Sequence, residues 1–346
     1  MLSTSVSPIC RMCQSADMDI GGRARSPPTG GATAGNCNGD SRLREIVWIA
    51  VDWGTSNLRV WGIGRDDEIV AEASSGNGMA KLDRSGFEPA LLELVGDWLP
   101  GHRRMPVIAC GMVGARQGWI EVPYRQAPCK PLLVSSVGHP ETIDQRMKMM
   151  VLGGIKQTNP TPDVMRGEET QIAGILSEQP MFEGVLCLPG THTKWVRICG
   201  GEIVHFSTFM TGELFSLLSL HSILRHSLND AGWNEVEFAN SVRSIVAEPA
   251  EFAGWLFSIR AEALISSLDA ATANARLSGL LIGAELAAAQ AYWQNQGLMI
   301  VGNGPQSELY AAGLRTLGRS PDVIDVSHVT LAGLKSAYRQ IARKSR

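Results

Sequence analysis

The sequence predicts an α/β protein built from two similar domains with a cleft between them. A short apolar strand that ends in a Gly-Thr turn occurs twice, once before Gly54 and again before Gly190. Two further extended runs follow each turn, so a strand, a glycine turn and a β-meander recur in the same order. Duplication of one α/β unit explains this recurrence economically. Two such units facing each other would form a cleft between their glycine turns.

Composition narrows the class of protein. The chain has 346 residues, of which 44% are hydrophobic and 19% charged, as expected for a folded globular protein of two domains. The formal net charge of −3 provides no basic field to favour nucleic acid or an anionic membrane. No apolar run approaches the roughly 20 residues of a membrane span. We expect a cytoplasmic protein without nucleic-acid or membrane partners, and its oligomeric state stays open.

Residues 1–44 differ from the rest of the chain. They contain no aromatic residue and include a stretch rich in Pro and Gly. Such a segment buries too little apolar surface to offset the entropy of ordering, so we expect a disordered extension. Cys10 and Cys13 form a C-x-x-C pair, but structural zinc needs four ligands and this segment adds only Cys37. We therefore expect no zinc site there.

Apolar and helical periodicity place the elements of the first domain, residues 45–180. We expect three successive strands, a helix, a fourth strand, an irregular segment rich in Gly and Pro, and a second helix. In order, these lie at 46–51, 58–61, 69–71, 88–98, 106–110, 111–136 and from Gly167 onward.

The second domain, residues 181–346, repeats this opening and then becomes helical. Three strands and three long helices precede a strand, a helix, a strand and a terminal helix. The expected strands are 185–188, 195–198, 203–209, 298–301 and 323–326, and the long helices are 213–224, 251–268 and 274–293.

The first Gly-Thr turn carries the residue types of a phosphate and metal site. Asp52 ends a buried strand, and Gly54 and Thr55 follow it. A glycine lets main-chain N–H groups approach phosphate oxygens, a hydroxyl adds a donor, and a carboxylate can hold a hydrated cation. An ordinary hairpin turn that begins with an acid is the alternative.

Two later segments strengthen the phosphate interpretation. Gly190 and Thr191 again follow an apolar strand, now with Lys194 nearby to neutralise anionic oxygen. Gly302 and Gly304 join a strand to a helix, where small residues would let a purine lie against the main chain near a helix N-terminus. Each segment alone could be a simple turn, but three in this order are much harder to explain in that way.

In this order the three segments resemble the two phosphate motifs and the adenosine motif of the actin, hexokinase and Hsp70 superfamily. Longer strings resemble the 2-dehydro-3-deoxygalactonokinase family more closely, from about Ile46 to the C-terminus. The narrowest are Met-Arg-Gly-Glu-Glu-Thr-Gln at 165–171 and Pro-Gly-Thr-His-x-Lys-Trp at 189–195, and the others lie at 52–59, 111–114, 210–214 and 277–285.

The resemblance implies two ribonuclease-H-like domains of the actin-like ATPase fold, each a mixed five-stranded sheet flanked by helices, with an interdomain cleft. It implies ATP-dependent phosphorylation of the terminal (6-) hydroxyl of 2-dehydro-3-deoxy-D-galactonate, with ATP mainly on the second domain and the sugar acid mainly on the first. Magnesium would bind at Asp52, and the nucleotide would lie against Gly54, Thr55, Gly190, Thr191, Lys194, Gly302 and Gly304.

The group that orients or deprotonates the attacking hydroxyl is expected at a helix start. Related sugar kinases carry Gly-Asp there, whereas this sequence has Gly167 followed by Glu168 and Glu169. Helical periodicity does not choose between the two acids, and the helix dipole alone would also favour acids at an N-terminus. We favour Glu168 and keep Glu169 as the alternative.

A keto-acid substrate also carries a carboxylate, which needs arginine, lysine or main-chain N–H groups. The candidate substrate-binding residues in the first domain are Asn57, Arg59, Arg116 and Arg166.

Two other functions compete with this one. A kinase for another small sugar or sugar acid would keep the phosphate motifs and change only the pocket. A non-catalytic ATP-binding sensor would share the fold but would need no base, so the Glu168–Glu169 pair argues against it. ATP turnover with and without a panel of sugar acids would separate these possibilities.

Overall fold

The computed structural model describes residues 45–228 and 232–344. The expected disordered extension at 1–44, with Cys10 and Cys13, lies outside the described residues. Within them, no helix combines the length and apolarity needed to cross a membrane.

The first five-stranded sheet has the order β3-β2-β1-β4-β6. Strand β2 is antiparallel to β1 and β3, whereas β1, β4 and β6 are parallel. The strands are β1 (Trp48–Trp53), β2 (Leu58–Ile63), β3 (Ile69–Ser75), β4 (Met105–Gly111) and β6 (Met147–Val151). Apart from Asp52, central strand β1 is apolar on both faces, and each face packs into its own hydrophobic cluster.

The second five-stranded sheet has the order β11-β10-β9-β12-β13 and the same strand directions as the first. Its strands are β9 (Gly184–Leu188), β10 (Thr193–Cys199), β11 (Glu202–Phe209), β12 (Leu298–Val301) and β13 (Asp322–Ile324). This identity of order and direction confirms the predicted pair of ribonuclease-H-like units and the actin-like ATPase fold.

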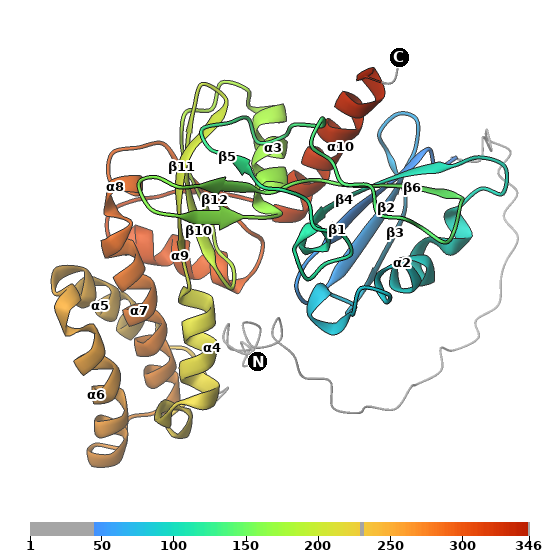
Figure 1. Ribbon diagram of the computed structural model, residues 1–346. Helices are drawn as coiled ribbons and strands as arrows, with labels where there is room; N and C mark the ends of the chain where they lie inside the picture. Colours follow the sequence, from blue (N-terminus) through green and yellow to red (C-terminus); the bar gives the residue numbers. More distant parts are fainter. Residues whose placement is uncertain (1–44, 229–231, 345–346) are drawn as a thin grey trace, which may run out of the picture.

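Two helices cross between the sheets and hold the units together (Figure 1). Helix α3 (Glu168–Glu178) follows the first sheet, and α10 (Val326–Lys344) follows the second. Each contributes side chains to the cluster on either sheet, so the boundary near residue 180 remains a prediction. The crossing is close: an ideal Cβ on Gly174 or Gly333 would lie 1.9 Å from a carbonyl oxygen of the other helix.

A helical subdomain is inserted between β11 and β12 and lies at the lower left of Figure 1. Its helices are α4 (Thr211–His221), α5 (Glu235–Ala247), α6 (Phe252–Ile265), α7 (Ala270–Ala288) and α8 (Gln290–Trp293). Helix α5 was not expected. It is capped by the Asn234 side chain, which accepts a hydrogen bond from the Glu237 N–H, and it buries Phe238, Val242 and Ile245 at helical spacing.

The remaining elements complete the two units. Helix α2 (Phe87–Val95) packs on the first sheet, and α9 (Pro305–Thr316) packs beside the second. Short 3₁₀ turns lie at Met79–Lys81, Gly96–Trp98, Met112–Gly114, Ile223–His226 and Pro249–Glu251.

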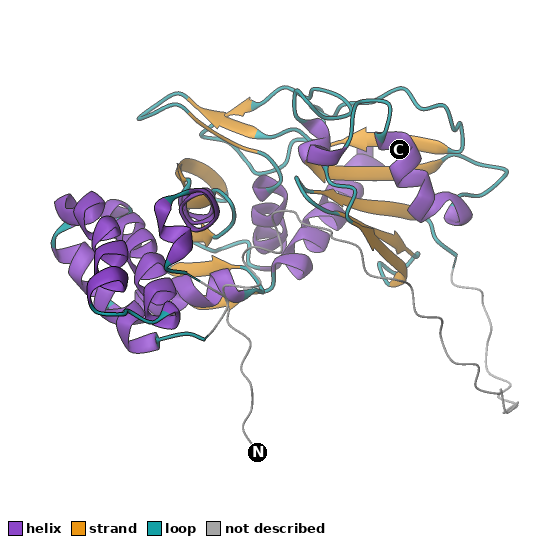
Figure 2. Ribbon diagram, turned by 90° about the horizontal axis from the view of Figure 1, so that it is seen from below, coloured by secondary structure: helices purple, strands orange, loops and turns teal. Residues whose placement is uncertain are grey.

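A third sheet, also unexpected, lies at the edge of the cleft. It has the order β5-β7-β8, with strands β5 (Arg125–Gln126), β7 (Ile155–Gln157) and β8 (Asp163–Met165). Figure 2, coloured by secondary structure, shows the long loops along the same side of the molecule as these short strands. Strand β8 leads directly into Arg166 and the start of α3, so this sheet positions one wall of the cleft.

Candidate active site

A cavity of about 650 Å³ lies between the two units. Both Gly-Thr turns, the start of α3 and the start of α9 form its walls. It brings together all the predicted nucleotide and metal positions and one predicted catalytic acid: Asp52, Gly54, Thr55, Glu168, Gly190, Thr191, Lys194, Gly302 and Gly304.

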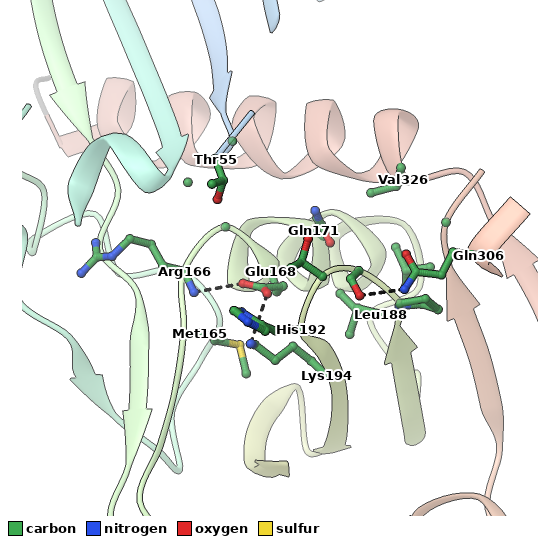
Figure 3. A pocket seen from close by; sticks show the side chains of 18 of the residues that line it. Thr55, Met165, Arg166, Glu168, Gln171, Leu188, His192, Lys194, Gln306 and Val326 are labelled. Atoms are coloured by element: carbon green, nitrogen blue, oxygen red, sulfur yellow. Dashed lines mark hydrogen bonds and ion pairs between the residues drawn. The ribbon is translucent and has the colours of Figure 1, made fainter. Parts of the chain in front are cut away.

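The first turn joins β1 to β2 and is held by its main chain. The Gly54 N–H donates to the Asn57 carbonyl at 2.9 Å, and the Thr55 carbonyl accepts from the Ala80 N–H at 2.9 Å. The turn rests on Gly78, where an ideal Cβ would lie 2.2 Å from the Ser56 carbonyl carbon. This packing leaves the Thr55 side chain directed into the cavity (Figure 3).

Asp52 lies at the cavity wall and is paired with Arg59. Arg59 donates to Asp52 Oδ2 from Nη2 at 2.5 Å and from Nε at 3.2 Å, and its Nη1 donates to Ser327 Oγ at 2.7 Å. No group of three or more metal-ligating side chains occurs among the described residues. A single carboxylate suits Mg²⁺, which is usually held by one or two carboxylates, water and substrate phosphates rather than by an all-protein cage.

The second turn joins β9 to β10 and is held by two helices. Gln306 at the start of α9 donates from Nε2 to the Gly190 carbonyl at 2.7 Å. Gly212 in α4 approaches the same carbonyl so closely that an ideal Cβ would lie 2.5 Å from its oxygen. Lys194 is almost fully buried, and its Nζ lies 3.6 Å from Glu168 Oε1. The turn, its lysine and the acid therefore meet at one side of the cavity (Figure 3).

The third predicted segment forms the N-terminus of α9. The Gly302 N–H donates to the Ile324 carbonyl at 2.9 Å, and the Gly304 N–H donates to Ser307 Oγ at 3.2 Å. The helix starts with Pro305 and directs its N-terminal end at the cavity. A helix N-terminus with glycine before it suits an anionic or purine ligand.

The two adjacent acids at the start of α3 have different surroundings. Glu168 lines the cavity and accepts a hydrogen bond from the Arg166 N–H at 3.0 Å. Glu169 is fully buried and accepts from the Gly167 N–H at 2.7 Å. Burial raises the pKa of Glu169 to about 7, and the nearby charge of Glu168 adds to that rise. Gly167 has a φ of 108°, which lets the chain turn so that only Glu168 faces the cavity.

The structure separates the four candidate substrate-binding residues. Arg166 lines the cavity and is 8% exposed. Arg59 is paired with Asp52. Arg116 lies exposed on a loop, and its main-chain carbonyl accepts a hydrogen bond from Arg84. Asn57 is exposed and contributes its carbonyl to the first turn. Of these four, only Arg166 is part of the cavity wall.

Further polar residues line the cavity and were not predicted, among them Gln171, Asn303 and Gln306. Gln171 follows Glu168 by three residues on α3, so helical spacing could have placed it on the same face. The role of Gln306 depends on its contact with Gly190, which is distant in the sequence, and no local pattern signals it.

The arrangement is suited to phosphoryl transfer. Two glycine turns and their threonines line one space, a lysine adds positive charge, and an acid is available for a hydrated cation. A second acid, Glu168, lies beside them. Transfer of a phosphoryl group needs mainly positioning and charge neutralisation, and this cavity offers both.

Comparisons with known proteins also indicate a phosphoryl-transferring enzyme. The model of the family described as 2-keto-3-deoxy-galactonokinase matches residues 52–337. A relative named 2-dehydro-3-deoxygalactonokinase from Rhizobium meliloti (strain 1021) is 39% identical over 301 residues, which cover 85% of this chain and 97% of the relative. A protein of that name from Escherichia coli (strain K12) is 30% identical over 296 residues, covering 85% and 98%. The crystal structure of a Sinorhizobium meliloti protein described as a 2-dehydro-3-deoxygalactonokinase superposes with a TM-score of 0.79 at 37% identity, covering 85% of this chain and 99% of that one.

Proposed function

This chain belongs to the 2-keto-3-deoxy-galactonokinase family of phosphotransferases with an alcohol acceptor, and we propose that it transfers the γ-phosphoryl group of ATP to the terminal (6-) hydroxyl of 2-dehydro-3-deoxy-D-galactonate. The observation that carries this proposal is the single cavity in which both Gly-Thr turns, Lys194 and Glu168 meet.

The nucleotide would bind across the two units. Its phosphates would lie against Gly54, whose N–H is bonded to the Asn57 carbonyl, and would accept hydrogen bonds from the main chain at Gly190 and from the hydroxyls of Thr55 and Thr191. Lys194 would add positive charge, and the adenosine would lie against Gly302 and Gly304 at the start of α9. Both walls therefore contribute to one phosphate site.

Asp52 would hold hydrated Mg²⁺, which when bound neutralises phosphate charge. Arg59 supplies the counter-charge to this carboxylate in the structure, with Nη2 2.5 Å from Oδ2. Because Asp52 Oδ2 is already bonded, occupation of that oxygen by the hydrated cation requires Arg59 to loosen its contact.

Glu168 would act as the general base toward the substrate hydroxyl. It lies at the cavity surface, whereas Glu169 is buried and is committed to the Gly167 N–H. Lys194, 3.6 Å away, restrains the Glu168 carboxylate on the side where the phosphate turns meet. A carboxylate placed there can accept the hydroxyl proton as the oxygen attacks phosphorus.

A coupled ADP-release assay tests the proposal. The purified protein is given ATP and Mg²⁺ with each member of a panel of 2-keto-3-deoxy sugar acids and of neutral sugars. We expect ADP release to require a sugar acid and to be fastest with 2-dehydro-3-deoxy-D-galactonate. Stronger stimulation by another sugar would reassign the substrate, and ATP binding without stimulation by any sugar would favour the sensor alternative.

A further inference from the structure

We propose that Arg166 binds the carboxylate of the sugar acid and thereby selects acids over neutral sugars. The inference rests on the proposed function and deepens it, because it names the group that recognises the end of the substrate opposite to the reacting hydroxyl.

Arg166 occupies a fixed place between two elements. It follows β8 directly and precedes Gly167, so it lies two residues before the proposed base Glu168. Its main-chain N–H donates to Glu168 Oε2 at 3.0 Å, while its side chain extends away from Glu168 and Lys194 (Figure 3). One residue thus connects the reacting end of the cavity with its far wall.

The Arg166 guanidinium is buried with few partners. It is 8% exposed and makes one hydrogen bond, from Nη2 to the Val122 carbonyl at 2.7 Å. It stacks on the Tyr124 ring, with its carbon 4.3 Å from the ring centre. Its Nε and Nη1 are both buried and have no hydrogen-bond partner. Buried donors without a hydrogen-bond partner are rare in native proteins, so we infer that a ligand supplies the missing acceptor for Arg166.

The charge of Arg166 has no ion-pair partner, and the acid whose charge it influences from further away is the buried Glu169. Two cationic side chains, Arg166 and Lys194, line the cavity, and Lys194 is paired with Glu168. No carboxylate among the described residues lies within ion-pair distance, 4.0 Å, of Arg166. A buried charge without an ion-pair partner is unfavourable, and an anionic ligand in direct contact would relieve it. Of these two cations, Arg166 is therefore the one that has no ion pair and could form one with the carboxylate of the substrate.

The chemistry of the group fits a carboxylate. A guanidinium presents several N–H donors in a rigid plane that matches the two oxygens of a carboxylate. Its present acceptor, the Val122 carbonyl, is neutral and weaker. A 2-keto-3-deoxy sugar acid carries its carboxylate at the end opposite to the terminal hydroxyl. With that hydroxyl at Glu168, the acid end would extend along the Arg166 side chain.

Calorimetric titration with two ligands tests this inference. One is the sugar acid, and the other is its amide, in which the carboxylate is replaced by a neutral group of similar size. We expect Arg166→Gln to weaken binding of the acid by roughly 10- to 100-fold, the worth of hydrogen bonds to a charged group. Binding of the amide and of ATP should stay within about threefold, and Arg166→Lys should restore part of the acid affinity.

The result that would overturn the inference is equal weakening for acid and amide, which would reduce Arg166 to a support for the loop at Val122. Unchanged acid affinity, or a selective loss in Arg116→Gln instead, would also overturn it. Arg104→Gln, which removes an exposed arginine that contacts Gln145, serves as the charge-matched control. Binding is measured apart from turnover, so an inactive but acid-selective protein would contradict the proposed function and still support Arg166.

A second variant guards against loss of folding. Gly114→Ala does not change Arg166 itself. An ideal Cβ at Gly114 would lie 2.8 Å from Arg166 Nη1, so the substitution would move the guanidinium from its present position. We expect a selective loss of acid affinity here too. A folded Gly114→Ala protein with unchanged acid and amide affinities would overturn the inference.

Discussion

Glu168 and Glu169 are neighbours in the sequence, yet one carboxylate lines the cavity and the other is fully buried. The sequence could predict an acid at the start of this helix, but not which acid. The turn at Gly167 decides it, because a φ of 108° directs the first helical residue toward the cavity. Such a choice depends on main-chain conformation rather than on residue type.

This difference gives a prediction at the residue scale. We expect Glu168→Gln to lower the rate of phosphoryl transfer by roughly 10²- to 10⁴-fold, the usual contribution of general acid–base catalysis. Glu169→Gln should cost much less, since its carboxylate does not reach the cavity. Single-turnover rates, with melting curves to verify folding, compare the two variants. A large loss at Glu169 alone would show that the base is the other acid.

Asp52 gives a second prediction. In Asp52→Asn the amide copies the shape of the carboxylate but not its charge toward a cation. We expect turnover to fall by roughly 10²- to 10³-fold, the range for removing one electrostatic contact to the transition state. The loss should be greatest at limiting Mg²⁺, and titrations of activity with Mg²⁺ at saturating ATP measure it. Near-normal activity at limiting Mg²⁺ would mean that the metal binds elsewhere.

At the scale of single elements, the start of α3 should make stability depend on pH. The pKa of Glu169 is raised from 4.5 to about 7 in the folded protein, so the folded state holds its proton more tightly than the unfolded state. The stability due to this proton is fully present below about pH 4.5 and is lost as pH rises through 7. The amide in Glu169→Gln does not titrate, so the variant does not lose stability in this way. The melting temperature of the variant relative to the native protein should therefore rise between pH 5 and pH 8, and a constant difference would contradict the assigned burial.

The crossing of α3 and α10 gives another prediction at this scale. Because an ideal Cβ at Gly174 would lie 1.9 Å from the Val329 carbonyl oxygen, Gly174→Ala must push the two helices apart. We expect a loss of roughly 1–3 kcal/mol in the free energy of unfolding, as for other overpacked sites. Denaturant titration measures it. The control is Gly254→Ala in α6, where the nearest atom is 4.0 Å away and a gain of about 0.5–1 kcal/mol is expected. Equal effects in both helices would argue against the close crossing.

Two elements, β6 and α5, were not predicted from the sequence. Strand β6 was not predicted because its sequence, Met-Lys-Met-Met-Val, is rich in a good helix former, and its pairing with β4 overrides that propensity. Helix α5 was missed because several β-branched residues weaken its helical signal, although Asn234 and the apolar spacing mark it in retrospect. Both elements are fixed by partners distant in the sequence.

At the scale of the whole molecule, the duplication was predictable because each copy opens with the same local pattern. The strand orders β3-β2-β1-β4-β6 and β11-β10-β9-β12-β13 then follow one topology. What local patterns could not supply are the contacts between distant segments, such as Gln306 with the Gly190 carbonyl within the second unit or Lys194 with Glu168 between the units. Those contacts turn three separate turns into one site.

The central claim is that this site transfers a phosphoryl group from ATP to the terminal carbon of the sugar acid. Phosphorus NMR of the reaction mixture tests it most directly, because coupling to the adjacent CH₂ protons identifies the esterified carbon. We predict a new phosphomonoester signal coupled to two protons of the terminal CH₂, formed in equal amount with ADP. Inorganic phosphate in place of that signal, or an ester on another carbon, would contradict the account.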